Sequence, residues 1–324
     1  MAAKDEFQIR FWGVRGSIAC PGRDTLRYGG NTSCIEVRCG EHLLIFDCGT
    51  GARELGKHLE SGTPTPMVDA DVFLTHTHLD HISGLPFFQP VYRADTKLRI
   101  WAGHLPPETP IRDVICAMMV APLFPVPIDS LHADISYNDF RAGETLAPKP
   151  GVSLRTTLLN HPDGATGYRI EYGGKSVCYV TDTEHVPDQP DENILALIEG
   201  ADIVIYDATY TDEEFPQFQA WGHSTWQEGA RLCEAAGVKT YVVFHHDPDH
   251  DDAFMDGIAD AVDRICPGAI VARDTFPFSI RRVYSALRSP SCNPRGAGYW
   301  PVIPKVCKPV PHCFYGPQVF SMCP

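Results

Sequence analysis

The sequence predicts an α/β protein in which two β-sheets pack together and helices cover their outer faces. Short apolar runs, such as residues 71–75, have the length and composition of buried strands, and turns often contain glycine. Helices are predicted between the later strands, for example at residues 225–236. Each half of the chain runs through several strands before its helices, an order that is typical of packed sheets with helices outside.

The elements follow one another in a regular order except in one segment. The expected strands lie at residues 8–12, 33–38, 42–47, 71–75, 98–102, 152–159, 166–172, 176–181, 202–207 and 240–244. The expected helices lie at residues 52–60, 110–120, 193–199, 225–236 and 251–265. Between residues 90 and 150 the pattern is less regular, and we expect an insertion there that could shape or cover a pocket.

The C-terminal region differs in composition from the rest of the chain. Residues 281–324 contain no Asp or Glu, although the whole chain has 41, and prolines and cysteines are frequent there. We therefore expect one folded domain at residues 1–282, interrupted by the segment of about residues 90–150, and a disordered Pro/Cys-rich tail at residues 283–324. Two origins of the tail stay open: a natural basic tail, or a shifted reading frame.

Charge and hydropathy limit the classes of partner. The formal net charge is −14, which argues against a broad basic surface for a large nucleic acid. A small anionic substrate held by metal ions remains compatible with it. No apolar run approaches the roughly 20 residues of a membrane span, and no signal peptide is evident at the start. We expect a cytoplasmic protein with no membrane partner.

The twelve cysteines are scattered, and none forms a Cys-x-x-Cys pair. Cys34, Cys39, Cys48 and Cys178 lie in or beside apolar, strand-like runs. Buried reduced thiols are therefore favoured over a disulfide framework or a structural zinc site.

Metal-binding residue types gather after the predicted strands. The segment His76-Thr77-His78-Leu79-Asp80-His81 packs three imidazoles and a carboxylate into six residues after an apolar strand. Further histidines and an aspartate follow later strands: His161, Asp182 and the pair His245 and His246. Imidazole and carboxylate are ligands that zinc prefers. A chance cluster on a solvated loop would not explain such residues after four separate strands.

These motifs together resemble the metallo-β-lactamase superfamily, from about residue 7 to residue 280. The resemblance implies a four-layer αββα sandwich and two divalent metal ions, zinc being expected and manganese the alternative. It implies that the first ion is held by His76, His78 and His161, and the second by Asp80, His81 and either His245 or His246. Asp182 would bridge the two ions. In the ribonuclease Z proteins one histidine follows the last strand directly, which favours His245 and leaves His246 as the alternative.

Such a ligand set implies catalysis, because seven ligands leave coordination positions of two ions open. We expect the nucleophile to be a metal-bound hydroxide, because bound cations lower the pKa of water from about 15.7 toward 7. Asp80 could orient this hydroxide while also serving as a ligand.

One further motif bears on the substrate. Trp221-Gly222-His223-Ser224-Thr225 resembles the His-Ser-Thr motif of the ribonuclease Z and phosphodiesterase branch. In that branch the histidine contacts the scissile phosphate and assists the leaving oxygen, so His223 is a candidate catalytic residue. The structural alternative is a helix-entry residue packed against Trp221, with Ser224 or Thr225 capping the helix.

Glycine-rich segments extend the resemblance to a bacterial subgroup described as cyclic-nucleotide-phosphodiesterase-like. They are Gly13-Val-Arg-Gly-Ser17, Gly29-Gly-Asn-Thr-Ser-Cys34 and Phe244-His-His-Asp-Pro248. Two interpretations of Arg15 and Asn31 stay open: each either contacts a phosphate or holds a loop together.

The function expected from the sequence is therefore hydrolysis of a small or cyclic phosphodiester. The extended basic arm that ribonuclease Z proteins use for transfer RNA is not evident, which favours a small substrate over a folded RNA. The alternatives are a lactonase or thioesterase of the same fold and a non-catalytic ligand-sensing member. A di-iron redox protein would need a flavin domain. The resemblance also implies a homodimer.

Overall fold

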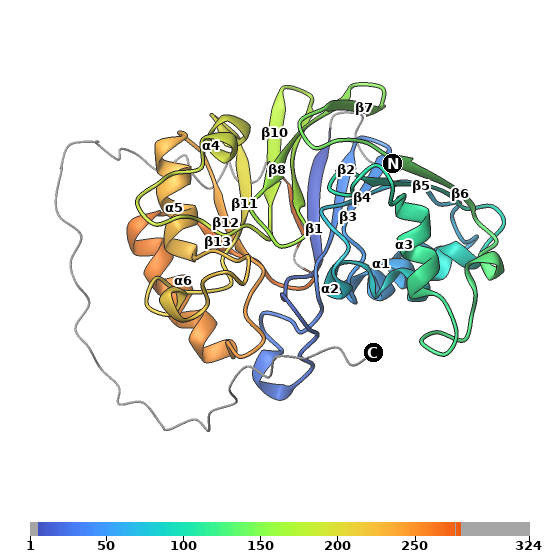
Figure 1. Cartoon of the computed structure of the whole chain (residues 1–324), viewed down its shortest axis with the longest axis horizontal. Helices are drawn as coiled ribbons and strands as arrows, with labels where there is room; N and C mark the ends of the chain where they lie inside the picture. Colours follow the sequence, from blue (N-terminus) through green and yellow to red (C-terminus); the bar gives the residue numbers. More distant parts are fainter. Residues whose placement is uncertain (1–5, 276, 280–324) are drawn as a thin grey trace, which may run out of the picture. The chain divides into compact units, whose positions relative to one another are not determined.

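Two seven-stranded β-sheets face each other in the computed structural model, which describes residues 6–275 and 277–279 (Figure 1). The first sheet has, in spatial order, the strands β14 (Pro277–Ser279), β1 (Phe7–Gly13), β2 (Cys34–Cys39), β3 (His42–Phe46), β4 (Asp69–Leu74), β5 (Lys97–Ala102) and β6 (Asp134–Asp139). The second has β13 (Ile270–Val271), β12 (Tyr241–Phe244), β11 (Ile203–Asp207), β10 (Lys175–Val180), β9 (Ala165–Tyr172), β8 (Val152–Leu159) and β7 (Thr145–Lys149).

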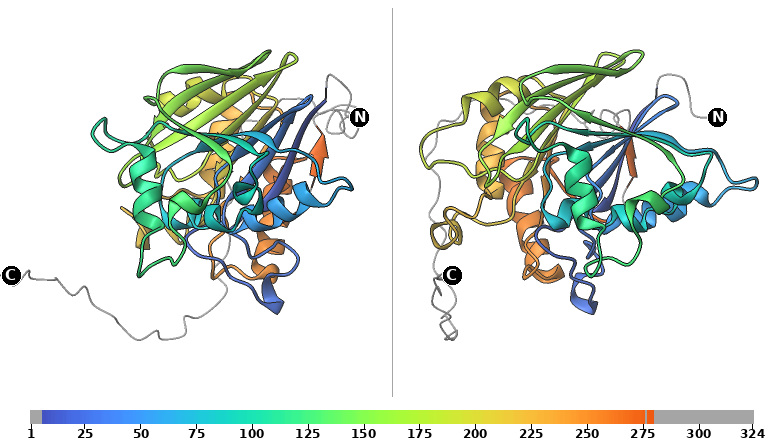
Figure 2. Two further views of the ribbon diagram at one scale, coloured as in Figure 1. Left: turned by 90° about the vertical axis from the view of Figure 1, so that its right-hand side faces the viewer. Right: turned by 45° about the vertical axis from the view of Figure 1, so that its right-hand side comes forward.

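Helices lie on the outer side of each sheet. The helices α1 (Gly51–Glu60) and α3 (Ile111–Met118) lie beside the first sheet in Figure 1, and α4 (Glu192–Ile198), α5 (Trp226–Ala235) and α6 (Asp252–Ile265) lie beside the second. The two turned views in Figure 2 show the same order of layers. The expected αββα sandwich is therefore confirmed.

Strands buried on both faces explain the long apolar runs of the sequence. In β3, Leu44 and Phe46 enter the core between the sheets, whereas Leu43 and Ile45 enter the core under α1 and α3. The same alternation holds in the second sheet, where Tyr179 of β10 faces the inter-sheet core. Because successive side chains of a strand point to opposite faces, only a continuous apolar run fills both cores.

Strand direction places the loops that follow the strands at one end of each sheet. β3, β4 and β5 are parallel to one another, as are β10, β11 and β12. The carboxyl ends of parallel strands meet at one edge, which is where layered α/β folds usually carry their sites. The fold itself therefore brings the residues that follow β4, β10 and β12 close to the residues that follow the adjacent parallel strands.

The short strands β6, β7, β13 and β14 were not predicted from the sequence. β6 and β7 both lie within residues 90–150, where the pattern appeared irregular. They are edge strands that extend the first and the second sheet respectively, so this segment is part of the sandwich. α2 (Leu79–Ile82), a single turn inside the histidine motif, was also not predicted.

Three other expectations can be placed on the structure. Cys34, Cys39, Cys48 and Cys178 are buried free thiols, and burial raises the pKa of Cys39 and of Cys178 to about 12. In the part of the chain that the structure describes, no helix has the length and apolar character to cross a membrane. The predicted tail at residues 283–324 lies outside the described residues, and the cytoplasmic location stays a prediction.

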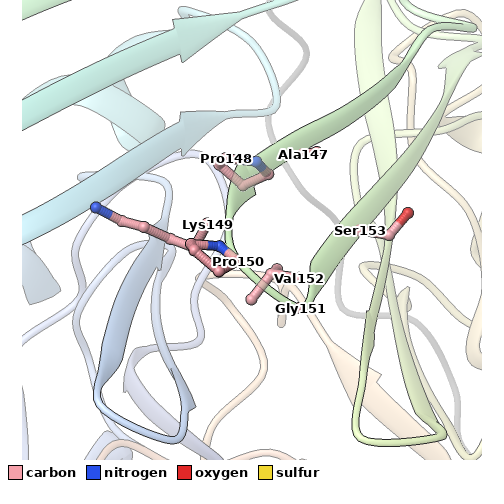
Figure 3. Close-up of a pocket in the computed structure, with 7 residues that line it drawn as sticks. All are labelled: Ala147, Pro148, Lys149, Pro150, Gly151, Val152 and Ser153. Carbon is pink, nitrogen blue, oxygen red and sulfur yellow. The ribbon is translucent and has the colours of Figure 1, made fainter.

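A surface pocket lies at the turn between β7 and β8 and is lined by residues 147–153 (Figure 3). β8 begins in this pocket at Val152 and ends at Leu159, and a strand of that length spans about 26 Å. The charged side chain of its lining, Lys149, forms ion pairs with Asp69 and Asp71. This pocket is therefore at the opposite end of the strand from His161.

Candidate metal centre

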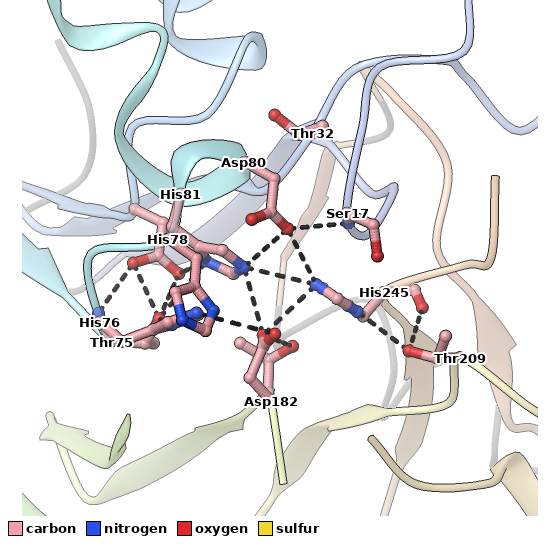
Figure 4. A network of polar contacts seen from close by, with 12 residues as sticks. Ser17, Thr32, Thr75, His76, His78, Asp80, His81, Asp182, Thr209 and His245 are labelled. Carbon is pink, nitrogen blue, oxygen red and sulfur yellow. Dashed lines mark hydrogen bonds and ion pairs between the residues drawn. The ribbon is translucent and has the colours of Figure 1, made fainter. Parts of the chain in front are cut away.

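The histidine motif continues directly from β4, as the sequence predicts. β4 ends at Leu74, and the backbone stays extended at His78, which precedes the single turn α2. His76 and His78 are two residues apart in this extended stretch, so their side chains point to the same side. Asp80 and His81 lie within the turn of α2. The change from extended chain to helical turn lets all four side chains face one region (Figure 4).

The second sheet supplies the remaining candidate donors from the ends of three strands. His161 follows β8, Asp182 follows β10 and His245 follows β12. Asp182 and His245 have left-handed backbone angles, with φ values of 60° and 62°. That conformation costs non-glycine residues about 1 kcal/mol or more each and turns the chain sharply at the strand end. Both side chains thereby point toward the histidine motif (Figure 4).

The first group of donors consists of His76, His78 and His161. Their ligand atoms lie within 4.8 Å of one another, and His161 Nε2 is 3.1 Å from His78 Nδ1. His76 Nε2 is buried and has no hydrogen-bond partner. A buried nitrogen left without a partner is costly, so its presence here needs an explanation.

The second group consists of Asp80, His81, Asp182 and His245, all of them buried. His81 Nε2 is 3.2 Å from Asp80 Oδ2 and 3.3 Å from His245 Nε2. His245 Nε2 is 3.5 Å from Asp80 Oδ2. The candidate ligand nitrogens and oxygens of these four side chains are thus close enough to one another to contact a single ion.

Asp182 lies between the two groups and presents one oxygen to each. Its Oδ1 is 3.9 Å from His76 Nε2 and 3.8 Å from His161 Nε2. Its Oδ2 is 3.2 Å from His81 Nε2 and 3.3 Å from His245 Nε2. The structure therefore brings all seven predicted donors together, with Asp182 in the position expected of a bridging carboxylate.

The residues present fit divalent cations. Imidazole nitrogens and carboxylate oxygens are the donors that zinc prefers, and the unpartnered His76 Nε2 is a donor without another use. Burial raises the pKa of Asp182, but His245, His81 and His76 outweigh burial and hold this pKa well below its usual range. Burial followed by the charge of His81 lowers the pKa of His76. Metal ligands must be deprotonated, and the shifts at Asp182 and His76 favour that state. Burial lowers the pKa of His81, but Asp182, Asp80 and Asp47 outweigh burial and raise it, so a cation bound there would have to displace a proton from this ring.

Three of the donor rings, those of His81, His161 and His245, are also held through their second nitrogen. His81 Nδ1 is 2.9 Å from Asp47 Oδ2, and His245 Nδ1 is 3.0 Å from Thr209 Oγ1. His161 Nδ1 donates to the carbonyl oxygen of Gly222 at 2.8 Å. Such contacts fix the tautomer and direction of an imidazole that could ligate a metal, so Nε2 of each of these three rings is directed at the donor groups.

Sequence reasoning did not assign a role to Asp47. It follows β3 with a φ of 59° and has no solvent exposure. Besides contacting His81, its carboxylate accepts hydrogen bonds from Thr75 N, Thr75 Oγ1 and Tyr179 Oη. The position of Asp47 at the end of a predicted strand was the available signal. The sequence could not show its role, because the side chains that contact it lie elsewhere in the chain.

Replacing Asp47 by Asn is expected to weaken metal binding about 10- to 100-fold, because one amide oxygen cannot replace both carboxylate oxygens, which accept from Thr75, Tyr179 and His81. Competition with a chelator measures the dissociation constant, and circular dichroism checks the fold. Tyr179→Phe is the control, because it removes another contact of Asp47 and leaves His81 held. Unchanged metal affinity in a folded Asp47→Asn protein would contradict this role.

Two glycines allow the backbone to approach the donor rings. A Cβ on Gly16 would lie 2.4 Å from the imidazole of His245, and a Cβ on Gly222 would lie 2.3 Å from His161 Nδ1. Gly222 also has a φ of +84°, which L side chains rarely adopt. Both positions therefore require glycine if His161 and His245 are to keep their places.

His223 lies beside the donor groups, just before α5. Its Nδ1 is 3.1 Å from Asp207 Oδ2 and 3.7 Å from Asp182 Oδ1. Burial lowers the pKa of His223, but Asp207 and Asp182 outweigh burial and raise it to about 9. Thr225 caps α5 by accepting from the backbone N–H of Glu228. Helix capping by this motif is therefore present next to a histidine that faces the centre.

Asp207 connects His223 to a metal-donor residue, and sequence reasoning did not assign it. Thr209 Oγ1 donates to Asp207 Oδ1 at 2.8 Å and lies 3.0 Å from His245 Nδ1. The other carboxylate oxygen of Asp207 contacts His223. One buried carboxylate thus fixes the directions of two neighbouring imidazoles.

His246 points away from the donor groups. Its Nε2–H donates to the carbonyl oxygen of Ala272 at 2.9 Å, and burial lowers its pKa to about 3. Arg15 is buried and donates to the carbonyl oxygens of Gly29, Asp247 and His250. Of the two interpretations of Arg15, these contacts support the one in which it holds loops together.

Asn31 contacts a buried carboxylate instead of the centre. Its Nδ2 donates to Asp274 Oδ2 at 3.1 Å, and its Oδ1 accepts from Thr50 Oγ1. Burial raises the pKa of Asp274 from 3.8 to about 7, although Asn31 and the charge of Arg15 lower it in part. This interaction also supports a loop-holding role for Asn31.

The pKa shift of Asp274 predicts a pH dependence of stability. Because its pKa is higher in the folded state, the folded protein retains a proton between about pH 4 and pH 7 that the unfolded chain releases. Stability therefore falls as pH rises through that window. The difference in free energy of unfolding between Asp274→Asn and the wild type should be on the order of 2 kcal/mol more favourable to the variant at pH 8 than at pH 5. Denaturant titrations at both pH values measure this, with exposed Asp24→Asn as the control. An equal difference at the two pH values would contradict it.

An αββα sandwich with imidazole and carboxylate donors at the ends of its strands defines a metal-dependent hydrolase. Residues 42–246 match the family described as the beta-lactamase superfamily domain. The chain belongs to this superfamily, which implies divalent metal ions.

Individual relatives place the chain more narrowly. Ribonuclease Z of Haloarcula marismortui is 26% identical over 283 residues, covering 74% of this chain and 85% of the relative. The structure of the metallo-β-lactamase fold protein YhfI from Bacillus subtilis has a TM-score of 0.62 at 17% identity, covering 85% of this chain and 100% of YhfI. The short form of human tRNase Z has a TM-score of 0.61 at 18% identity, covering 84% of this chain and 99% of that chain. The resemblance to the ribonuclease Z and phosphodiesterase branch is thus confirmed.

The expectation that a large nucleic acid is not a partner is wrong. The relatives are named for ribonuclease Z, an enzyme class that acts on RNA, and they are similar to this chain over most of its length. The net charge of −14 is a sum over the whole chain. Phosphate binding depends on charge near the site, where divalent cations contribute most, so the sum does not exclude RNA.

Proposed function

We propose that this protein hydrolyses phosphodiester bonds of RNA at a centre of two divalent cations, with zinc the expected metal. The observation that carries this proposal is the position of Asp182, whose two oxygens face two separate groups of donors. Paired cations of this kind are typical of phosphatases and nucleases. The names of the relatives favour RNA as the diester.

The proposed ligand set is divided between the two ions. His76, His78 and His161 would hold one, Asp80, His81 and His245 would hold the other, and Asp182 would contact both. Bound there, divalent cations supply a Lewis acid for the phosphoryl oxygen and lower the pKa of water. His246 has no place in this set, because its ring nitrogens belong to none of the donor groups and its Nε2 donates to Ala272 O.

The chain's own residues would orient the attacking water and supply a proton to the leaving oxygen. Asp80 Oδ2 accepts from the backbone N–H of Ser17 at 2.8 Å, which fixes the carboxylate that would orient the attacking water. With Nδ1 of His223 committed to Asp207, its Nε2 can carry the proton for the leaving oxygen. Attack forms a P–O bond to the water oxygen and breaks the P–O bond to the leaving group, which His223 would protonate.

The test uses purified protein supplied with zinc or manganese. Substrates are a precursor transfer RNA with a 3′ extension, an unstructured RNA, 2′,3′- and 3′,5′-cyclic nucleotides, bis(p-nitrophenyl) phosphate and a lactone. Cleavage of either RNA, with the lactone untouched, is expected. Turnover of the lactone alone would overturn the proposal in favour of carbonyl chemistry. Less than one bound ion per chain after metal supply would overturn the two-cation centre.

A further inference from the structure

The loop between β11 and α5 carries a row of aromatic side chains that leads from His223 to the surface. His223 lies 6.1 Å from Tyr210 between ring centroids, and Tyr210 stacks on Phe218 at 4.5 Å with an interplanar angle of 8°. Phe218 contacts Trp221 edge to face at 5.7 Å. Tyr210 is buried, whereas Trp221 is 63% exposed. The row therefore begins beside the catalytic candidate and ends in solvent.

The loop is held firmly against the donor residues. The backbone N–H groups of Ala220 and Gly222 donate to the two carboxylate oxygens of Glu184, at 2.9 and 2.8 Å. Gly222 O accepts from His161 Nδ1, so the residue after Trp221 is bound to a donor ring. The position of Trp221 relative to the centre is therefore fixed before any substrate arrives, which lowers the entropic cost of binding.

From this arrangement we propose that Trp221 and Phe218, called here the aromatic platform, bind a nucleobase next to the scissile phosphate by stacking. This proposal rests on the phosphodiesterase function proposed above and specifies how its substrate is recognised. A flat apolar ring at the edge of a charged centre matches a nucleotide, which joins a flat base to a charged phosphate. Stacking accepts every base because each has a π face.

The charge beside the loop supports the same occupant. The charged side chain that holds the loop, Glu184, is a carboxylate, so the loop itself offers a nucleotide ring stacking and not an ion pair with phosphate. Base stacking contributes about 1–3 kcal/mol per base without needing positive charge. A second copy of this chain is the competing occupant of an exposed tryptophan, and the experiment below separates the two.

The kinetic experiment compares two diesters with the same leaving group. One is thymidine 5′-(p-nitrophenyl phosphate), and the other is its analogue without the base. Trp221→Ala is expected to raise KM for the first diester roughly 5- to 150-fold, which corresponds to the stacking energy, and to leave kcat and the second diester unchanged. Trp221→Phe should restore most of the loss. Phe254→Ala, which removes another exposed aromatic side chain that stacks on His250, is the matched control.

A binding experiment keeps this test independent of catalysis. AMP is expected to quench the fluorescence of the metal-loaded wild type, ribose 5-phosphate is not, and Trp221→Phe should lose the quenching. Hydrolysis of no diester, with AMP quenching present, would overturn the proposed function but not the platform. Equal KM changes for both diesters, or no quenching by AMP, would overturn the platform. Self-association that is lost in Trp221→Ala, with base affinity unchanged, would assign Trp221 to contact between copies.

Discussion

Alanine in place of Asp182 is expected to reduce hydrolysis by roughly three orders of magnitude, or about 4 kcal/mol of transition-state stabilisation. The reason is geometric, since Asp182 Oδ1 faces His76 and His161 and Asp182 Oδ2 faces His81 and His245. Both donor groups therefore lose an oxygen at once. Bound metal, measured by elemental analysis after gel filtration, should fall to one ion per chain or fewer.

Two further variants make this result interpretable. Asp182→Asn keeps one donor oxygen but loses the charge, so its metal content and rate should lie between those of wild type and Asp182→Ala. Asp163→Asn is the matched control, because the Asp163 carboxylate is 92% exposed and lies 3.7 Å from His78 without entering either donor group. Full metal content and full turnover in a folded Asp182→Ala protein would remove the basis for a shared carboxylate.

His223→Ala is expected to lower kcat by about 10²- to 10⁴-fold on diesters with an alkoxide leaving group. The effect should be small for p-nitrophenyl esters, because p-nitrophenolate leaves without a proton. Asp207→Asn should give a smaller loss of the same kind, since one amide oxygen cannot accept from both His223 and Thr209 and the charge beside His223 is removed. Steady-state rates on RNA and on bis(p-nitrophenyl) phosphate measure this difference.

The control for this comparison is His185→Ala. His185 is a nearby imidazole that contacts Ser224 Oγ at 2.8 Å and belongs to neither donor group. Its loss should affect both leaving groups equally. Equal losses on both substrates in His223→Ala would assign His223 to structure and not to proton transfer.

Most strands, and the gathering of seven candidate donors, could be predicted from the sequence. Imidazoles and carboxylates after apolar runs indicated the cluster, and the family resemblance divided them into two groups and favoured His245 over His246. The coordinates show where His246 points instead. Adjacent residues at a strand end face different sides, and the left-handed backbone of His245 decides which one enters the centre.

What the sequence did not show depends on partners that are distant in the chain. Asp47 orients His81 only because Tyr179 and Thr75 also direct donors at it. β7 contains Pro148, which weakens its strand pattern. In β6, Ile135 and Tyr137 alternate with polar residues and pack on a core, so this strand did have a sequence signal, although a short one. The error about large nucleic acids came from treating total charge as a property of the site.

The division of candidate donors between the two sheets makes the spacing of the donor atoms depend on the apolar interior. Asp80 and His81 follow the first sheet, whereas Asp182 and His245 follow the second, and His81 and His245 are 164 residues apart in sequence. The thickness of the apolar layer between the sheets, which includes Phe46, therefore determines how far apart the donor atoms of the two sheets lie. A cavity made there is expected to change the distances between donor atoms of the two sheets, although it would touch none of them.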